Sequence, residues 1–264
     1  MAREKGMDVD IERFNELMQE QKERARADGK FVSGESGRSI EEIDSEGESS
    51  EFQFLGYHQH RADVRITAVN RDDDSPSLWL DQSPFYAESG GQVADTGTLT
   101  HNESGETIRI KDVQKSSRGF EHFVDKLPES LSGVWEARID SDKRNEIQKH
   151  HTATHLMHAA LRETLGDHVA QKGSLVDADR LRFDFSHYEA VTPEQLDDIE
   201  RRVNDKIQEN IPSHIEEMSI DEAREKGAMM LFGEKYGDVV RVVTFDPDYS
   251  MELCGGTHVS AMGE

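Results

Sequence analysis

The stretch NEIQKHHTATHLMHAALRETL, residues 145–165, carries the clearest fold signal in the chain. Selected side chains recur at intervals of three and four residues: Ile147, His151, Thr154, His158, Leu161 and Leu165. This spacing places them on one face of an α-helix, and the glycine that follows at Gly166 is a common helix end. We therefore predict a helix with one buried face that ends at Gly166.

Two histidines of this helix, His151 and His155, are one turn apart and can reach a common point. Much later the only cysteine stands in Cys254-Gly255-Gly256-Thr257-His258, where a Gly-Gly-Thr turn would fold both end side chains to one side. Either pair alone would also suit an ordinary core or surface position. Together, the Cys and His side chains predict a four-ligand zinc site: His151, His155, Cys254 and His258.

The kind of zinc site is not fixed by the spacing. A metalloprotease helix carries a glutamate directly after its first histidine as general base, whereas this chain has Thr152 there. Peptide hydrolysis is therefore disfavoured. Four protein ligands would close a structural site, whereas a catalytic site needs an exchangeable position, and both remain open.

Residues 141–264 are expected to form an α+β domain. Two more helices are predicted because a Thr or Ser cap is followed three residues later by Gln or Glu: Thr192 with Gln195, and Ser219 with Glu222. Residues 181–185 and 239–245 have strand-like composition. Helices packed on one face of an antiparallel sheet would give the α+β class.

Residues 51–140 are expected to form a small β-barrel. Alternating segments at 62–69, 77–80 and 107–110 predict half-buried strands between turns. Within this region stand PFYAESGGQ (84–92) and DTG (95–97). The paired Gly90 and Gly91 either let backbone N–H groups approach a ligand or make a tight hairpin turn.

The first 50 residues have a different character. Residues 1–30 place a few large apolar side chains at helical spacing among charged residues, which predicts an amphipathic helix at the end of a larger region. Residues 31–50 are rich in Ser, Gly and Glu and predict a flexible acidic linker.

Composition limits the class of protein. The 264 residues contain one cysteine, so no internal disulfide is available and a reducing compartment is expected. No leader or membrane-length apolar run is present, which predicts a cytoplasmic protein. The 31 Lys and Arg against 55 Asp and Glu give a net charge of −24. Such acidity repels phosphate, unless it is a solvation device in a salty cytoplasm that leaves a local basic groove.

Several motifs together resemble one family. The segments 150–162, 171–176, 181–187 and 254–258 closely resemble the editing domain of alanyl-tRNA synthetases. The segments 85–92 and 95–97 resemble the glycine-rich barrel of that family, and residues 1–27 resemble the segment before it. This resemblance implies that residues 1–30 are the helical end of the preceding tRNA-binding region. The resemblance covers everything except the 31–50 linker.

This resemblance implies hydrolysis of the ester in Ser-tRNA(Ala) or Gly-tRNA(Ala), an aminoacyl-tRNA deacylase activity. It implies zinc bound by the four ligands, with Gln171 as a polar residue near the reacting end. Thr154 and Thr257 are hypothesised to hydrogen-bond the serine hydroxyl. Zinc would activate water or position the substrate, because the motifs offer no evident carboxylate base.

Contacts to substrate or tRNA are expected from Gly90, Gly91, Gln92, Lys172, Arg182 and Thr257. Basic residues beside the motifs would form a rim for the acceptor end of tRNA(Ala), or else are ordinary solvated charges: Lys143, Arg144, Lys149, Lys172, Arg180 and Arg182.

The residues include no adenylating segment, so ATP and Mg²⁺ are expected only in the rest of a parent synthetase. We therefore interpret the chain as a C-terminally truncated fragment of that enzyme. The alternatives are a freestanding trans-editing deacylase, a non-catalytic zinc and tRNA-binding module, and the editing domain of threonyl-tRNA synthetase. The last shares the histidine and cysteine motifs, but Ser89-Gly90-Gly91-Gln92 disfavours it.

Overall fold

The structure is a computed structural model that describes residues 13, 40–43, 52–72, 74–230 and 236–264. The chain divides into two compact units, Met1–Ser39 and Ile40–Glu264. The predicted helix over 1–30, apart from Arg13, and most of the predicted 31–50 linker lie outside the described residues. The second unit contains every candidate site residue.

One part of the linker prediction is wrong. Ile40–Glu42 form strand β1, which pairs antiparallel with β4 (Ile66–Asn70). The two glutamates of β1 make ion pairs with Arg71 and Arg118, and Ile43 packs against the hydrophobic core. These partners lie far along the chain, so local composition could not indicate them.

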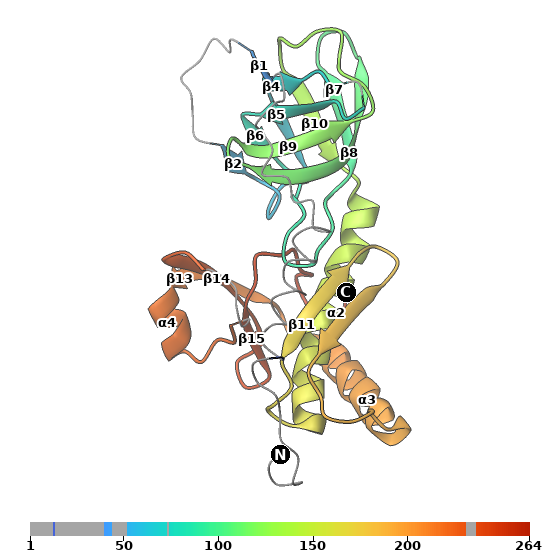
Figure 1. The fold of residues 1–264 in the computed structure, drawn as a ribbon, viewed down its shortest axis with the longest axis vertical. Coiled ribbons are helices and arrows are strands. Elements are labelled where there is room, and N and C mark those ends of the chain that lie inside the picture. Colours follow the sequence, from blue (N-terminus) through green and yellow to red (C-terminus); the bar gives the residue numbers. More distant parts are fainter. Residues whose placement is uncertain (1–12, 14–39, 44–51, 73, 231–235) are drawn as a thin grey trace. The chain divides into compact units, whose positions relative to one another are not determined.

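Most strands of the unit belong to one antiparallel sheet, whose order is β1-β4-β5-β9-β8-β7-β10-β3. Figure 1 shows this sheet in blue to green. Its other strands are β3 (Arg61–Val64), β5 (Ser77–Leu80), β7 (Gly97–His101), β8 (Thr107–Ser116), β9 (Gly119–Val124) and β10 (Trp135–Ile139). Two short strands, β2 (Gln53–Phe54) and β6 (Gln82–Ser83), pair in parallel beside it.

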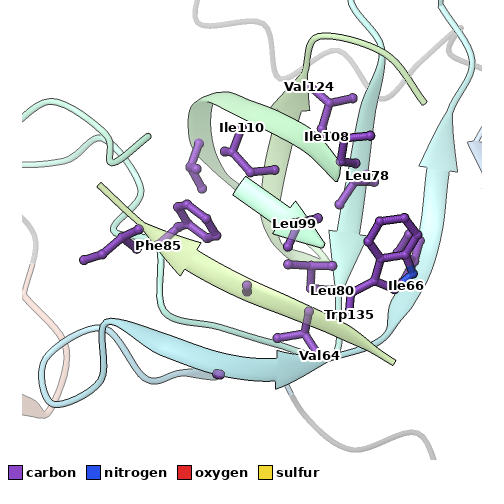
Figure 2. Close-up of a cluster of buried hydrophobic side chains, with 14 of the residues drawn as sticks. Val64, Ile66, Leu78, Leu80, Phe85, Leu99, Ile108, Ile110, Val124 and Trp135 are labelled. Atoms are coloured by element: carbon purple, nitrogen blue, oxygen red, sulfur yellow. The ribbon is translucent and has the colours of Figure 1, made fainter. Parts of the chain in front are cut away.

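The three predicted strand segments are confirmed, with 62–69 divided between β3 and β4 at Arg65. Buried and exposed residues alternate along β3 and along the first half of β8. The inward side chains form one apolar core, and Figure 2 shows Leu78, Leu99 and Ile108 among them. Burial of apolar side chains from these strands in one common core therefore explains why they form a sheet.

Hydrogen bonding does not close this sheet into the expected barrel. Among the described residues, the end strands β1 and β3 do not pair with each other. However, only Arg65 separates β3 from β4, and its N–H and C=O both bond to Asp81. The bend at Arg65 therefore brings the two ends of the sheet near each other without a closing ladder.

Helix α2 (Ser141–Leu165) follows the sheet directly and confirms the predicted helix, which begins at Ser141 rather than at residue 145. The Asp140 side chain caps its start by accepting from the N–H of Lys143, and Gly166 ends it with φ of 110°. The predicted face is buried around Ile147 and the histidines that follow it. This helix carries half of the candidate zinc ligands.

The remaining elements confirm the α+β class. Both predicted capping boxes are present, at the starts of α3 (Pro193–Glu209) and α4 (Ile220–Glu225). The strands form a hairpin and a three-stranded antiparallel sheet (Figure 1): β11 (Gln171–Val176) with β12 (Leu181–Phe185), and β13 (His214–Ser219), β14 (Val239–Asp246) and β15 (Ser250–Leu253). Among the described residues, no helix is long and apolar enough to span a membrane.

Candidate metal centre

Four side chains with metal-ligating atoms meet between α2 and the turn after β15. His151 and His155 come from α2, and Cys254 and His258 come from the turn. The ligating atoms of all four lie within 4.8 Å of one another. The imidazoles are buried and the thiol is partly buried. The structure thus brings together the four residues that the spacing selected.

The separations inside this cluster suit a tetrahedral ion. Sγ of Cys254 lies 3.4 Å from Nε2 of His151 and 3.4 Å from Nε2 of His258. Tetrahedral zinc, with bonds of about 2.3 Å to sulfur and about 2.0–2.1 Å to nitrogen, would separate such atoms by roughly 3.5 Å. The donor set and its spacing are therefore compatible with zinc.

Two of the imidazoles are oriented through their other ring nitrogen. Nδ1 of His151 lies 2.7 Å from Oε1 of Gln92, and Nδ1 of His258 lies 3.2 Å from Oγ1 of Thr152. Partners of this kind fix the tautomer and the ring orientation of metal-ligating histidines. The Nε2 atoms of both rings are left to face Cys254.

A buried carboxylate, Glu252, lies beside the rings of His155 and His158. Its Oε2 lies 3.5 Å from Nδ1 of His155, and its Oε1 lies 3.1 Å from Nδ1 of His158. Burial raises the pKa of Glu252, but the charge of His155 and the hydrogen bond from His158 outweigh burial and leave the pKa below its ordinary value. Glu252 is therefore an ionised carboxylate that accepts a hydrogen bond from His158 and lies close to the ring of His155.

The cluster favours a thiolate. Burial alone would raise the pKa of Cys254, but the charges of His151, His258 and His155 outweigh burial and hold the pKa well below its ordinary value. Burial lowers the pKa of His258 to about 3. In His155, the charges of Glu252 and Cys254 outweigh burial and raise the pKa to about 9. Because metals bind thiolate and neutral imidazole, cation binding would displace the His155 proton.

Arg241 and Tyr57 hold the turn at residues 254–258. Nη1 of Arg241 donates to the carbonyl oxygens of Cys254 and Gly256, both at 2.8 Å. The Tyr57 hydroxyl donates to the carbonyl oxygen of Gly255 at 2.7 Å, and the Arg241 guanidinium lies 4.2 Å from the centre of the Tyr57 ring. These contacts fix the turn that presents the thiol.

The paired glycines make a tight turn, which is one of the two interpretations that the sequence allowed. Gly90 and Gly91 have φ of 60° and 85°, and the N–H and C=O groups of Ser89 and Gln92 bond across them. The carbonyl oxygen of Gly91 accepts from the N–H of Val176 at 2.7 Å, so the turn also docks on β11. The turn places Gln92, which is fully buried, beside the metal centre.

A small pocket of about 130 Å³ opens beside three of the four ligands, His151, His155 and Cys254. This volume is well below the ~300–1,000 Å³ typical of pockets for drug-sized ligands, so the pocket suits a group of amino-acid size. Three predicted substrate residues line it, namely Gly90, Thr154 and Gln171. The Thr154 hydroxyl donates to the carbonyl oxygen of His150 at 2.8 Å, so it can act on a ligand only as an acceptor.

Other predicted contact residues lie outside the pocket lining. Gln92 donates to Oγ1 of Thr257 and accepts from its N–H, each at 2.9 Å. Gln92 and Thr257 therefore support the ligands from outside the pocket. A Cβ at Gly91 would collide with Ser174, so this glycine permits close packing on β11. Lys172 and Arg182 are exposed on β11 and β12.

The prediction that Arg144 belongs to a basic rim is wrong. Its guanidinium is fully buried, pairs with Asp95, and donates to the carbonyl oxygen of Gly56 at 2.7 Å. It therefore anchors the start of α2 on the sheet. Three other rim cations have acidic partners: Lys149 with Glu146, Arg180 with Asp177, and Arg182 with Asp184.

Sequence reasoning missed Glu252 and His158 as site residues. Both line the pocket, together with Ser174 and Phe183. The helical spacing identified His158 only as a member of the buried face, although it lies on the same face as His151 and His155. Glu252 stands two residues before Cys254, but nothing local separates it from other glutamates.

Comparison with protein families defines the class. Residues 1–144 match the family described as tRNA synthetases class II (A), and residues 240–264 match the threonyl and alanyl tRNA synthetase second additional domain. The second match includes Cys254 and His258. The chain thus belongs to the class II aminoacyl-tRNA synthetases.

More precisely, the chain belongs to the alanyl-tRNA synthetase family. It is 53% identical over 270 residues to the alanine–tRNA ligase of Salinibacter ruber, a match that covers 100% of this chain and 28% of that protein. The alanine–tRNA ligases of Acetivibrio thermocellus and Idiomarina loihiensis are 44% and 42% identical, with 100% of this chain and 31% and 30% of those proteins covered. The chain therefore spans less than a third of the length of these relatives.

Proposed function

We propose that this chain is the editing part of an alanine–tRNA ligase and hydrolyses the ester that joins serine or glycine to tRNA(Ala). The observation that carries the proposal is that three residues of the four-ligand cluster line a pocket of amino-acid size. An editing site is needed because an alanine-binding site cannot exclude the smaller glycine and rejects serine only weakly.

In this proposal the side chains around the pocket hold the ester in place. Gln171 donates to Oγ of Ser174 at 3.3 Å and lines the pocket, where its amide can bind the ester. Thr154 offers a hydroxyl oxygen as acceptor. Gln92 and Thr152 keep the imidazoles oriented. Zinc, when bound, would supply Lewis acidity to the carbonyl or to an attacking water.

The partner in this proposal is tRNA(Ala), together with the rest of the parent synthetase, in the cytoplasm. The exposed Lys172 and Arg182 would contact the acceptor end, and most of the acidic surface would face away from it. Residues 51–140 would serve as the glycine-rich barrel and residues 141–264 as the editing domain. ATP-dependent attachment of alanine, with Mg²⁺, would belong to the remaining parts of the parent enzyme.

A second candidate function is a structural zinc module that binds tRNA without hydrolysis. The observation that favours it is the set of four protein ligands, which would fill a tetrahedral coordination shell. The pocket beside the cluster favours hydrolysis instead, because a purely structural site needs no cavity of amino-acid size.

Deacylation assays separate these two functions. The zinc-loaded chain and its Cys254→Ala variant are incubated with Ser-tRNA(Ala), Gly-tRNA(Ala) and, as the control, Ala-tRNA(Ala). We expect selective release of serine and glycine by the unmodified chain, and loss of release with retained tRNA binding in the variant. Absence of hydrolysis by the folded, zinc-loaded chain would support the structural module and overturn the editing proposal.

A further inference from the structure

One buried ring in the pocket has an unused hydrogen-bonding atom. His158 is 2% exposed, lies three residues after His155 on α2, and lines the pocket. Its Nε2 has no hydrogen-bond partner among the described residues. Buried side-chain polar atoms in native proteins nearly always have a partner, so this atom indicates one supplied from outside the chain.

The tautomer of His158 follows from its neighbour. Nδ1 lies 3.1 Å from Oε1 of Glu252, and a carboxylate can only accept a hydrogen bond. Nδ1 therefore carries the proton in the neutral ring, and Nε2 carries a lone pair. The partner expected at Nε2 is a hydrogen-bond donor.

The surroundings of His158 limit the kind of donor. The Phe183 ring lies 5.2 Å from the His158 ring, centre to centre, and Leu253 also lines the pocket. The nearby Glu252 carboxylate already accepts from Nδ1 of His158, on the other side of the ring from Nε2, and a neutral hydroxyl costs less to bury beside apolar side chains than an ammonium group does. A hydroxymethyl group, which is apolar at its carbon and donates from its oxygen, fits this corner of the pocket.

We propose that Nε2 of His158 accepts a hydrogen bond from the side-chain hydroxyl of a misattached serine, which makes His158 a specificity-determining residue. This inference rests on the proposed editing function. An alanyl group would place a methyl against the acceptor and leave it buried and unpaired, which is how a polar site rejects an analogue without the hydroxyl. A glycyl group leaves space that a water molecule can fill, so its hydrolysis does not depend on Nε2.

The first test changes only the substrate. The unmodified zinc-loaded chain is given tRNA(Ala) carrying serine, glycine or 2-aminobutyrate, in which a methyl replaces the serine hydroxyl. We expect kcat/KM for 2-aminobutyrate to be at least about 10-fold below that for serine. Equal rates for these two esters would overturn the role of His158. Failure to hydrolyse either the seryl or the glycyl ester would instead overturn the proposed function.

The second test changes the ring. His158→Phe keeps a ring of similar size and removes the acceptor, whereas His158→Gln retains an amide that can both donate and accept. We expect His158→Phe to lower kcat/KM for the seryl ester on the order of 10- to 100-fold with the glycyl ester within about 2-fold, and His158→Gln to recover part of the loss. Bound zinc per chain is measured in each variant.

A merely structural role for His158 makes a different prediction. If the ring acted only by supporting Glu252 and His155, His158→Phe would slow the seryl and glycyl esters equally or release zinc. Either result would overturn the hydroxyl contact. The contact would also be overturned if His158→Phe kept the same preference for the seryl ester over the 2-aminobutyryl ester as the unmodified chain.

Discussion

Oε1 of Gln92 lies 2.7 Å from Nδ1 of His151, although one residue follows the glycine turn in the loop that leads into β7 of the large sheet and the other lies on α2. The same oxygen accepts from the backbone N–H of Thr257, in the turn that carries Cys254 and His258. A single buried amide thus connects the sheet to both halves of the metal centre.

We expect Gln92→Ala to weaken zinc binding roughly 10- to 100-fold, because the oxygen that orients His151 is lost. Competitive titration of zinc against a chelator measures the change. Gln59→Ala is the control, since Gln59 is exposed. Equal zinc affinities in the two variants would contradict the orienting role of Gln92.

Neighbouring glycines of the metal turn should respond in opposite ways. A Cβ at Gly256 would overlap the His151 ring and approach Oε1 of Gln92 to 3.0 Å, whereas at Gly255 its nearest atom would be Oη of Tyr57 at 3.9 Å. We expect Gly256→Ala to lower zinc content and Gly255→Ala to retain it. Metal analysis of the purified variants provides the comparison. Full zinc occupancy in Gly256→Ala would contradict the close packing of Gly256 on the His151 ring.

The buried pair of Arg144 and Asp95 should contribute strongly to stability. Asp95→Ala leaves a fully buried guanidinium without its counter-charge, which typically costs about 3–5 kcal/mol. Urea unfolding measures the free energy of unfolding. Arg201→Ala, which removes an exposed cation from its pairs on α3, should cost far less, because solvent screens exposed ion pairs. Similar losses in both variants would argue against a special role for the buried pair.

Stability should fall in mildly acidic solution because of His122. Burial lowers the pKa of His122 from 6.5 to about 4 in the folded chain. Between these pH values the unfolded chain binds the additional proton, so His122 contributes stability that is complete above pH 6.5 and is lost as the pH falls towards 4. His122→Phe should flatten the stability profile in this window, whereas the exposed His58→Phe should not. Identical pH profiles for the two variants would disprove the assignment.

Local signals predicted the helices well. The capping boxes at Thr192 and Ser219 and the glycine at Gly166 act through neighbouring backbone groups, so their effect is visible over a few residues of sequence. The ligand cluster was also accessible, because His151 and His155 share a helix face and Cys254 and His258 share a short turn.

Long-range relations escaped prediction. The pairing of Ile40–Glu42 with β4 and the burial of Arg144 depend on partners from distant segments. Glu252 gains its role only because β15 lies against α2, where His155 and His158 meet it. Gln92 was predicted to contact substrate, but in the fold it bonds to His151 and does not line the pocket. Sequence patterns identify the metal-ligating side chains more readily than the side chains that orient them.

The central claim is that the centre of His151, His155, Cys254 and His258 hydrolyses mischarged tRNA. Its most direct test is the single-turnover rate of serine release from Ser-tRNA(Ala) by metal-stripped protein as zinc is added back. We expect almost no release without metal and a rate that rises until one zinc is bound per chain. Release that is unaffected by stripping, or that stays absent with the centre fully loaded, would contradict the claim.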